Sequence, residues 1–281
     1  MYKTLFLLIM MTFSSVMAES LLVGSFNLRC PGDKAPNNWE NRAPRLFRDL
    51  ERIGFDIFGS QETVPGYVKD ICGKLGYRAI GHGRNADKGG ESVAIFYNPQ
   101  RLDLISDETF WLSETPETCS MSWGTTLPRI ATIGVFKDKK TGGSFIFANV
   151  HLHHQRMYET QKKQLNVVFE RLKAKYDSSM PVILTGDFNS NPSHPAARLA
   201  AEHLRDARLV SVVPAKGPQN ETYHGYQADP AKRRHKERID YIFVSPGITV
   251  QEFATVDNFD KNGLASSDHY PVSARILIKQ D

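Results

Sequence analysis

Polar side chains able to do chemistry follow, or lie within, short apolar runs at six places along the sequence. They are Asn27, Glu62, His151, the pair Asp187 and Asn189, Asp240, and the pair Asp268 and His269. Protein sites are usually built where a rigid scaffold ends and its loops begin. We therefore expect these carboxylate, amide and imidazole groups to converge on one rim of the fold, although they are spread over most of the chain.

The chemistry that suits this set is the attack of water on a phosphate ester. Glu62 and Asp268, with the amide of Asn27, offer hard oxygen ligands of the kind that Mg²⁺ or Mn²⁺ prefers. A carboxylate such as Asp187 can orient or deprotonate the attacking water, and the two imidazoles can donate hydrogen bonds to phosphate oxygens as charge accumulates. No protein nucleophile is required.

The elements that must position these groups are short strands. Eight runs of four to eight residues, rich in Val, Ile and Phe and bounded by Gly, Pro, Asn or Asp, predict strands. They span residues 21–26, 55–59, 92–97, 130–136, 144–150, 182–185, 239–244 and 272–278. Helical spacing of apolar residues predicts helices over 46–53, 165–172 and 195–204. Many strands and few helices without a linker predict one domain, a four-layer α/β sandwich of two packed mixed sheets flanked by helices.

The N-terminus has the pattern of a cleavable export signal. Residues 1–18 contain one early cation, Lys3, then an apolar run from Leu5 to Met11, and end in small residues at Ala18. The apolar run is too short for a membrane anchor. We therefore expect a signal peptide over residues 1–18, a catalytic domain over residues 19–281, and an exported protein that is periplasmic or secreted, without stable membrane insertion.

Composition excludes several classes of protein. The 35 Lys and Arg residues nearly balance 31 Asp and Glu residues, which excludes a histone-like polycation, and 41% hydrophobic residues are enough for a full core. We expect a monomer. The cysteines Cys30, Cys72 and Cys119 have no metal-binding spacing and allow at most one disulfide.

Taken together, the motifs resemble those of the endonuclease/exonuclease/phosphatase superfamily. The ordered segments are SFNLR, SQE, NVHLHHQ, LTGDFNSNP, RIDYIFVSP and SSDHYPV. The further segments NNWENRAPRL, GGESVAIFY, ETFWLSETPE, LPRIATI and TYHGY resemble bacterial members near the deadenylase-like branch. The resemblance covers nearly all of residues 19–281, and it implies a deoxyribonuclease I-like fold and a phosphate-ester substrate.

The resemblance also implies a role for each matching residue. Glu62 would be the principal Mg²⁺ ligand, with Asn27 and Asp268 completing or supporting the metal site. Asp187 would position the attacking water, and Asn189 would hold the scissile phosphate.

Two histidines would contact the same phosphate. His269 would be oriented by Asp240, and His151 by Glu91 of the GGES segment. Such pairing raises imidazole basicity and favours the charged donor form. Arg129 in LPRIAT is a further candidate phosphate contact, the alternative being a structural ion pair.

The sequence departs from the family pattern in two places. Many relatives carry Asp two residues after the catalytic histidine, where this chain has His153, so the roles of His153 and His154 stay open. The segment Lys232 to Arg238 has five cations in seven residues. It would bind a second phosphate or a nucleic-acid backbone, or form a solvated loop.

The sequence thus predicts a Mg²⁺-dependent hydrolase of phosphodiesters, a nuclease or phosphodiesterase that acts by in-line attack of water. One alternative is a phosphatase or a phospholipase C-type hydrolase of a sugar, inositol or lipid phosphate. Phe110-Trp111-Leu112 is its only candidate membrane-contact segment, and a buried strand edge explains that segment equally well. The other alternative is a non-catalytic binding protein on the same fold.

Overall fold

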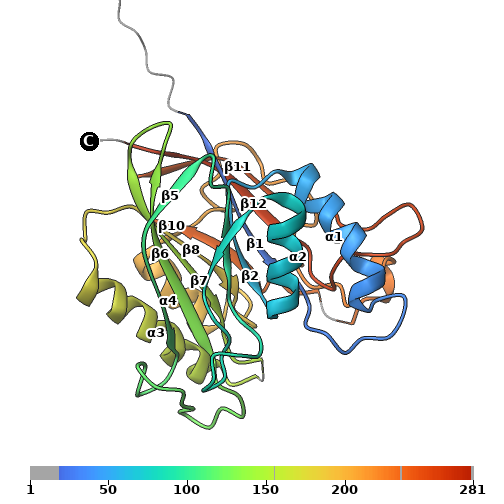
Figure 1. Ribbon diagram of the computed structural model, residues 1–281, viewed down its shortest axis with the longest axis horizontal. Coiled ribbons are helices and arrows are strands. Elements are labelled where there is room, and N and C mark those ends of the chain that lie inside the picture. The colour runs from blue at the N-terminus through green and yellow to red at the C-terminus, as the bar shows by residue number, and fades with distance from the viewer. Residues whose placement is uncertain (1–18, 155, 235, 280–281) are drawn as a thin grey trace, which may run out of the picture.

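The computed structural model describes residues 19–154, 156–234 and 236–279, so the predicted signal peptide lies outside the described residues (Figure 1). Its elements, in chain order, are β1 (Leu21–Asn27), α1 (Trp39–Ile53), β2 (Ile57–Gln61), α2 (Pro65–Leu75), β3 (Arg78–Ile80), β4 (Ile95–Tyr97), β5 (Leu102–Trp111), β6 (Ile130–Asp138), β7 (Ser144–His151), α3 (Tyr158–Lys175), β8 (Val182–Asp187), α4 (Pro195–His203), β9 (Arg205–Asp206), the 3₁₀ turn η1 (Pro230–Lys232), β10 (Asp240–Val244), β11 (Ile248–Thr255) and β12 (Val272–Ile278).

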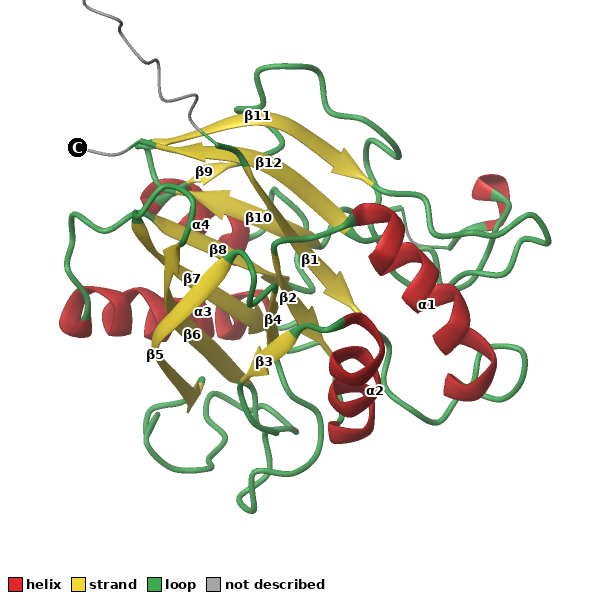
Figure 2. Ribbon diagram, turned by 45° about the horizontal axis from the view of Figure 1, so that its top comes forward, coloured by secondary structure: helices red, strands yellow, loops and turns green. Residues whose placement is uncertain are grey.

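The strands form two six-stranded mixed sheets. The first sheet has the order β11-β12-β1-β2-β4-β3, and the second has the order β5-β6-β7-β8-β10-β9. Each sheet has one parallel pair at its centre, β1 with β2 and β7 with β8, and the other neighbours are antiparallel. In Figure 2, α1 and α2 lie outside one sheet and α3 and α4 outside the other. The predicted four-layer sandwich is confirmed.

Three apolar layers hold these four layers together. Because successive side chains of a strand point to opposite faces, each central strand serves two layers. In β1, Val23 belongs to the core between the sheets, whereas Phe26 packs with Leu46 and Leu50 of α1. A third cluster joins the second sheet to α3 and α4. Strands covered on both faces read as continuous apolar runs, which explains why the sequence revealed them.

The helices α1 and α2 end where the sequence supplies a glycine. Gly54 and Gly76 have φ of 69° and 73°, a left-handed conformation that a Cβ disfavours. Their N–H groups donate to the carbonyls of Leu50 and Cys72, which satisfies the last turn. These ends return the chain toward the sheet.

Each of the eight predicted runs overlaps a strand, and the three predicted helices overlap α1, α3 and α4. The sequence did not predict α2, β3, β5, β9 or β11. Phe110-Trp111-Leu112 is 2%, 6% and 2% exposed at the end of β5, so it forms a buried strand edge and no membrane-contact loop.

Two further expectations concern membranes and disulfides. In residues 19–154, 156–234 and 236–279, no helix is both long and apolar enough to cross a bilayer. Cys30, Cys72 and Cys119 are all described, and each is a partly buried free thiol.

Candidate active site

Strand register brings the predicted site residues to one edge of the sandwich. In the first sheet, Asn27 pairs with Gln61 at the carboxyl ends of parallel strands, and Glu62 follows directly. In the second sheet, His151 pairs with Asp187, and Asp187 pairs in turn with Asp240 on the next strand. Three site residues therefore occupy adjacent positions across β7, β8 and β10.

The loop before β12 supplies the last two predicted residues, Asp268 and His269. Because β12 runs antiparallel to β1, with Val272 opposite Ser25, this loop lies beside the end of β1. The hydroxyl of Ser267 donates to the backbone carbonyl of Asn27 at 2.6 Å, which links this loop to the last residue of β1.

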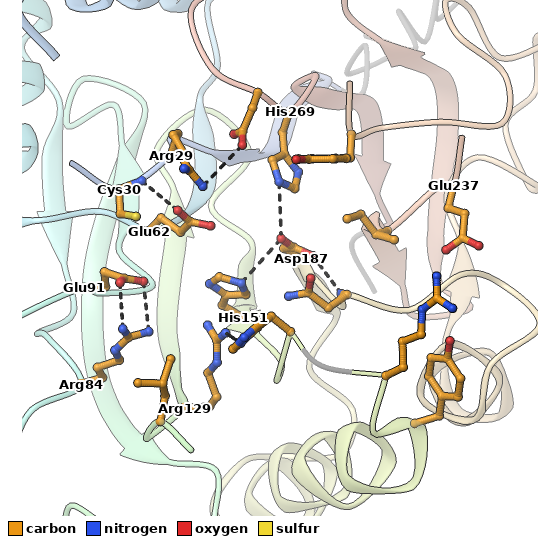
Figure 3. A pocket seen from close by; sticks show the side chains of 18 residues that line it. Arg29, Cys30, Glu62, Arg84, Glu91, Arg129, His151, Asp187, Glu237 and His269 are labelled. Carbon is orange, nitrogen blue, oxygen red and sulfur yellow. Dashed lines mark hydrogen bonds and ion pairs between the residues drawn. The ribbon is translucent and has the colours of Figure 1, made fainter. Parts of the chain in front are cut away.

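A pocket of about 470 Å³ opens over this edge (Figure 3). Eight of the ten predicted site residues line it: Glu62, Glu91, Arg129, His151, Asp187, Asn189, Asp268 and His269. The other two, Asn27 and Asp240, are fully buried behind it. Both hold pocket residues in place, as their hydrogen bonds show.

Asp187 is the centre of the arrangement. Its Oδ2 lies 3.6 Å from Nε2 of His151 and 3.8 Å from Nε2 of His269, and Figure 3 shows it between the two rings. The backbone N–H of Asn189 donates to Oδ1 at 2.8 Å, and Nδ2 of Asn27 donates to Oδ2 at 3.0 Å. Burial, together with the charge of Asp240, raises the pKa of Asp187 to about 7. This carboxylate can therefore exchange a proton near neutral pH.

The two histidines differ in charge. Nδ1 of His269 bonds to Oδ2 of Asp240 at 2.9 Å, as the sequence predicted. Burial alone would lower the pKa of His269, but the carboxylate of Asp240 raises it to about 10. Burial and the nearby charge of Arg129 hold the pKa of His151 well below its ordinary value. The site thus has one cationic and one neutral imidazole.

Glu62 supplies a fixed anionic carboxylate. Its Oε1 accepts from Nδ2 of Asn27 at 3.1 Å, and its Oε2 accepts from the backbone N–H of Cys30 at 2.8 Å. Burial would raise the pKa of Glu62, but the backbone N–H of Cys30 and the cationic imidazole of His269 hold it well below its ordinary value. Glu62 is therefore ionised where it lines the pocket.

The donor set fits a divalent cation at Glu62 and Asp268. Both residues line the pocket and carry hard carboxylate oxygens, which suit Mg²⁺ or Mn²⁺. Oδ1 of Asn27 accepts from the backbone N–H of Arg29 at 2.9 Å, so the amide presents its NH₂ to Glu62 and Asp187. In this orientation the NH₂ of Asn27 supports both carboxylates, and its part in completing or supporting the metal site stays a prediction.

A second group of donor atoms lies close by. Ligand atoms of Asp187, Asp240 and His269 lie within 4.8 Å of one another. Because the imidazole stands between the two carboxylates and bonds to one of them, this group is arranged to hold a proton. The Glu62 side, which has only oxygen donors, fits a hard cation better.

Glu91 does not orient His151, contrary to the prediction. Both of its carboxylate oxygens accept from the guanidinium of Arg84, at 2.8 and 3.0 Å. His151 instead faces Asp187. The reason is that Arg84, seven residues earlier in the same loop between β3 and β4, offers two N–H groups that match a carboxylate.

Arg129 is 5% exposed, and within the described residues it has no carboxylate partner. One of its Nη atoms lies 3.2 Å from Nδ1 of His154. Burial, with the nearby charge of Arg84, lowers the pKa of Arg129 to about 10, so the guanidinium stays charged at neutral pH. It is a buried cation on the wall of the pocket, as an anion site requires.

The other two histidines of the HLHH segment, His153 and His154, lie in different environments. His154 lines the pocket, and burial and the charge of Arg129 lower its pKa, which leaves it neutral to accept from Arg129. His153 is 0% exposed, and its backbone bonds to Gln164 and Gln161 of α3. His153 therefore belongs to the packing of α3 against the sheet.

The basic segment 232–238 is mostly neutralised by its own fold. Arg233 is buried in an ion pair with Glu221, and Arg238 is buried in an ion pair with Asp206. Lys232 lies 3.5 Å from Asp229. Among the described residues of the segment, Arg234 and Lys236 are the exposed cations without such a partner.

Several pocket residues were not predicted. They are Arg29, Arg84, Arg156, Tyr158, Tyr223 and Glu237. Arg29 could have been found because it stands in the SFNLR motif, and its Nη1 lies 3.7 Å from Oδ2 of Asp268. The ring of Tyr223 packs edge-on against His269 with centroids 5.0 Å apart. The others lie on loops or at helix ends, where no sequence pattern marks them.

Comparison with known proteins decides the family. The model of the Endonuclease/Exonuclease/phosphatase family matches residues 24–269. The chain belongs to this family. Because the family and its solved members are phosphoester-hydrolysing enzymes, the protein is a phosphoester hydrolase. The family generally depends on divalent metals, which agrees with the carboxylates of the pocket.

Solved relatives cover nearly the whole chain. A family member from Bacteroides thetaiotaomicron has 32% identity and a TM-score of 0.85 over 93% of this chain and 99% of that chain. A mannosyl-6-phosphatase of B. thetaiotaomicron VPI-5482 has 32% identity and a TM-score of 0.84 over 92% of this chain and 100% of that chain. Carbon catabolite repressor protein 4 homolog 4 of Arabidopsis thaliana is 20% identical over 86% of this chain and 72% of its own length, in line with the predicted deadenylase-like branch.

Proposed function

We propose that this protein is a Mg²⁺-dependent phosphatase that removes phosphate from a small hydroxylated molecule such as a sugar phosphate. The observation that carries this proposal is an open pocket of about 470 Å³ lined by the proton-transfer groups Asp187, His151 and His269. Pockets of this volume suit small ligands. The 32% identity to a mannosyl-6-phosphatase, over nearly both full chains, supports the same substrate class.

The chain's own residues would carry the proton transfers. Asp187 orients the attacking water and accepts its proton, since its pKa near 7 matches neutral conditions. His269, held cationic by Asp240, donates to a phosphate oxygen as negative charge develops. His151 contacts the phosphate from the opposite side of Asp187. Mg²⁺ held by Glu62 and Asp268 would neutralise charge on the phosphate.

The walls of the pocket would recognise the rest of the substrate. Arg129 has its charge free for a phosphate oxygen, and Asn189 lies at the pocket floor beside Asp187. In Figure 3, Glu237 lies on the far side of Asp187 from Arg84 and Glu91. Carboxylates accept hydrogen bonds from hydroxyl groups, so this wall suits a polyhydroxylated leaving group.

The preference for a phosphodiester in a nucleic acid has lost its main support. It rested on the basic segment 232–238, where Arg233 and Arg238 are occupied by Glu221 and Asp206. The buried position of Phe110-Trp111-Leu112 likewise removes the segment proposed to contact lipid. A non-catalytic role is not proposed, because every proposed site residue has a competent chemical type and they converge on one pocket.

A substrate panel tests the proposal. Purified protein with MgCl₂ is supplied with hexose 6-phosphates, inositol phosphates, a single-stranded oligonucleotide, plasmid DNA and sphingomyelin vesicles, and parallel samples contain EDTA. We expect Mg²⁺-dependent release of inorganic phosphate from a sugar phosphate. Cleavage of the oligonucleotide or plasmid without hydrolysis of any small phosphate would overturn the phosphatase proposal in favour of a nuclease.

We also propose that residues 1–18 are removed on export and that residues 19–281 act as a monomeric exported enzyme. N-terminal sequencing of the protein recovered from a bacterial periplasm or culture medium tests this, since a mature chain should begin at Glu19. Retention of Met1 to Ala18 in the recovered protein would contradict it. Size-exclusion chromatography with light scattering reports the oligomeric state.

A further inference from the structure

A layer of buried polar side chains lies between the two sheets, directly beneath the site. It consists of Ser25, Gln61, Asn149 and Thr185, from β1, β2, β7 and β8, and each is 0% exposed. Polar groups in such an interior cost free energy unless they are hydrogen-bonded. Apolar residues could fill the same layer, as Val23, Phe147 and Ile183 do two residues earlier on β1, β7 and β8.

The side chain of Asn149 links the two sheets. Nε2 of Gln61, from the first sheet, donates to Oδ1 of Asn149 at 2.7 Å. Within the second sheet, the hydroxyl of Thr185 lies 3.2 Å from the same oxygen and 3.2 Å from the backbone carbonyl of Ala148. Nδ2 of Asn149 donates to the backbone carbonyls of Ser60 and Ala94, at 2.8 and 3.1 Å. Asn149, which belongs to the second sheet, is thus bound at three points to the first.

Strand geometry connects this layer to the site. Residues two apart in a strand lie on the same face. Asn149 stands two residues before His151 and Thr185 two residues before Asp187, so layer and site occupy successive positions on the face between the sheets. Gln61 directly precedes Glu62. A change in the distance between the two sheets at this layer would therefore shift the site residues that follow it on each strand.

The first sheet leaves room for this layer through Gly59. A Cβ at this position would lie 2.4 Å from Cγ and Oδ1 of Asn149 and 2.4 Å from Oγ1 of Thr185. Real contacts of a Cβ are longer, so a side chain here would displace the hydrogen-bonded groups. The close approach of the two sheets at this level depends on a glycine.

We propose that Asn149 is a positioning residue which, with its amide oriented by Thr185 and bound by Gln61, fixes the distance between the two sheets at the catalytic edge. It thereby sets Glu62 of the first sheet against His151 and Asp187 of the second. None of the three polar residues lines the pocket, so none acts by touching substrate. This inference rests on the proposed catalytic site.

Two sets of variants test it. Asn149→Leu removes every hydrogen bond of the amide, and Thr185→Val removes one hydroxyl that Thr185→Ser retains. Ile276→Ala is the control for lost stability, because Ile276 lies in the same core layer, opposite Leu21 at the far end of β1. All are assayed with MgCl₂ at a temperature at which circular dichroism shows them folded.

We expect Asn149→Leu to lower kcat about 100-fold, the loss typical of a displacement near 1 Å in a catalytic site, with a much smaller change in KM. Thr185→Val should lower kcat less, and Thr185→Ser should restore it. The rise in Tm on adding MgCl₂, which does not depend on turnover, should shrink in Asn149→Leu and persist in Ile276→Ala.

The proposal is overturned if Asn149→Leu loses no more kcat than Ile276→Ala and keeps the full MgCl₂-induced rise in Tm. If Asn149→Leu does not fold, wild-type kcat in Thr185→Val overturns it equally. A fully active Glu62→Gln variant would sink the proposed site itself. An inactive Glu62→Gln beside a fully active Asn149→Leu would sink the positioning role alone.

Discussion

Replacing Asp240 by Asn should destabilise the protein by an amount that depends on pH. The carboxylate lies 2.9 Å from Nδ1 of His269, and both side chains are buried. Asn has nearly the same shape as Asp, but it lacks the negative charge that stabilises the protonated ring of His269. Breaking a buried ion pair typically costs about 3–5 kcal/mol, because the remaining charge is left unpaired.

The sign of the pH dependence follows from the pKa of His269. That pKa is raised from 6.5 to about 10 in the folded state. At about 1.4 kcal/mol per pKa unit, the protonated pair contributes at most about 5 kcal/mol. The contribution is fully present below pH 6.5 and is lost as pH rises through 10. The raised pKa of Asp187 opposes part of it, so we expect a net loss of about 3–4 kcal/mol at pH 6.

Urea unfolding of the metal-free protein, followed by circular dichroism at pH 6, 8 and 10, measures this difference in free energy of unfolding. Asp206→Asn is a matched control, because it breaks the buried pair with Arg238 outside the pocket. A guanidinium keeps its charge over this range, so the control should lose the same free energy at each pH. An equal loss at pH 6 and pH 10 in Asp240→Asn would refute the reasoning.

Three other predictions concern packing, substrate binding and metal. Gly59→Ala should lower the free energy of unfolding by about 1–3 kcal/mol through overpacking, measured by urea unfolding, whereas Gly66→Ala, whose Cβ would meet nothing within 4 Å, should not destabilise. Arg129→Met should raise KM for the substrate more than it lowers kcat, and an unchanged KM would exclude Arg129 as a phosphate contact. EDTA should abolish hydrolysis and MgCl₂ restore it, with activity that survives exhaustive chelation as the contrary result.

The strands that the sequence revealed are those with both faces covered. The central strands read as continuous apolar runs because cores lie on both sides of each sheet. Strand β5 carries exposed charges at Asp103 and Asp107, and β11 alternates buried and half-buried positions, so neither has such a run. Helix α2 begins with Pro65 and contains Gly66 and Gly73, which hide its helical pattern.

The contacts of the site residues divide in a similar way, into those that sequence motifs predict and those that loop geometry decides. The pairing of His269 with Asp240 follows from the family motifs. The partners of Glu91, Arg233 and Arg238 do not, because each is chosen by loop geometry over separations of 7, 12 and 32 residues. A run of cations in a sequence carries no sign of the carboxylates that will neutralise it.

The most direct test of a metal-assisted phosphatase is the steady-state hydrolysis of the best small phosphate substrate by Glu62→Gln. Glu252→Gln, the same chemical change at an exposed residue paired with Lys216, is the matched control. We predict that kcat/KM falls by at least about 100-fold in Glu62→Gln, since charge stabilisation in the transition state is lost, and stays at the wild-type value in the control. Wild-type kcat/KM in Glu62→Gln, at the same MgCl₂ concentration, would contradict the assignment of this pocket as the active site.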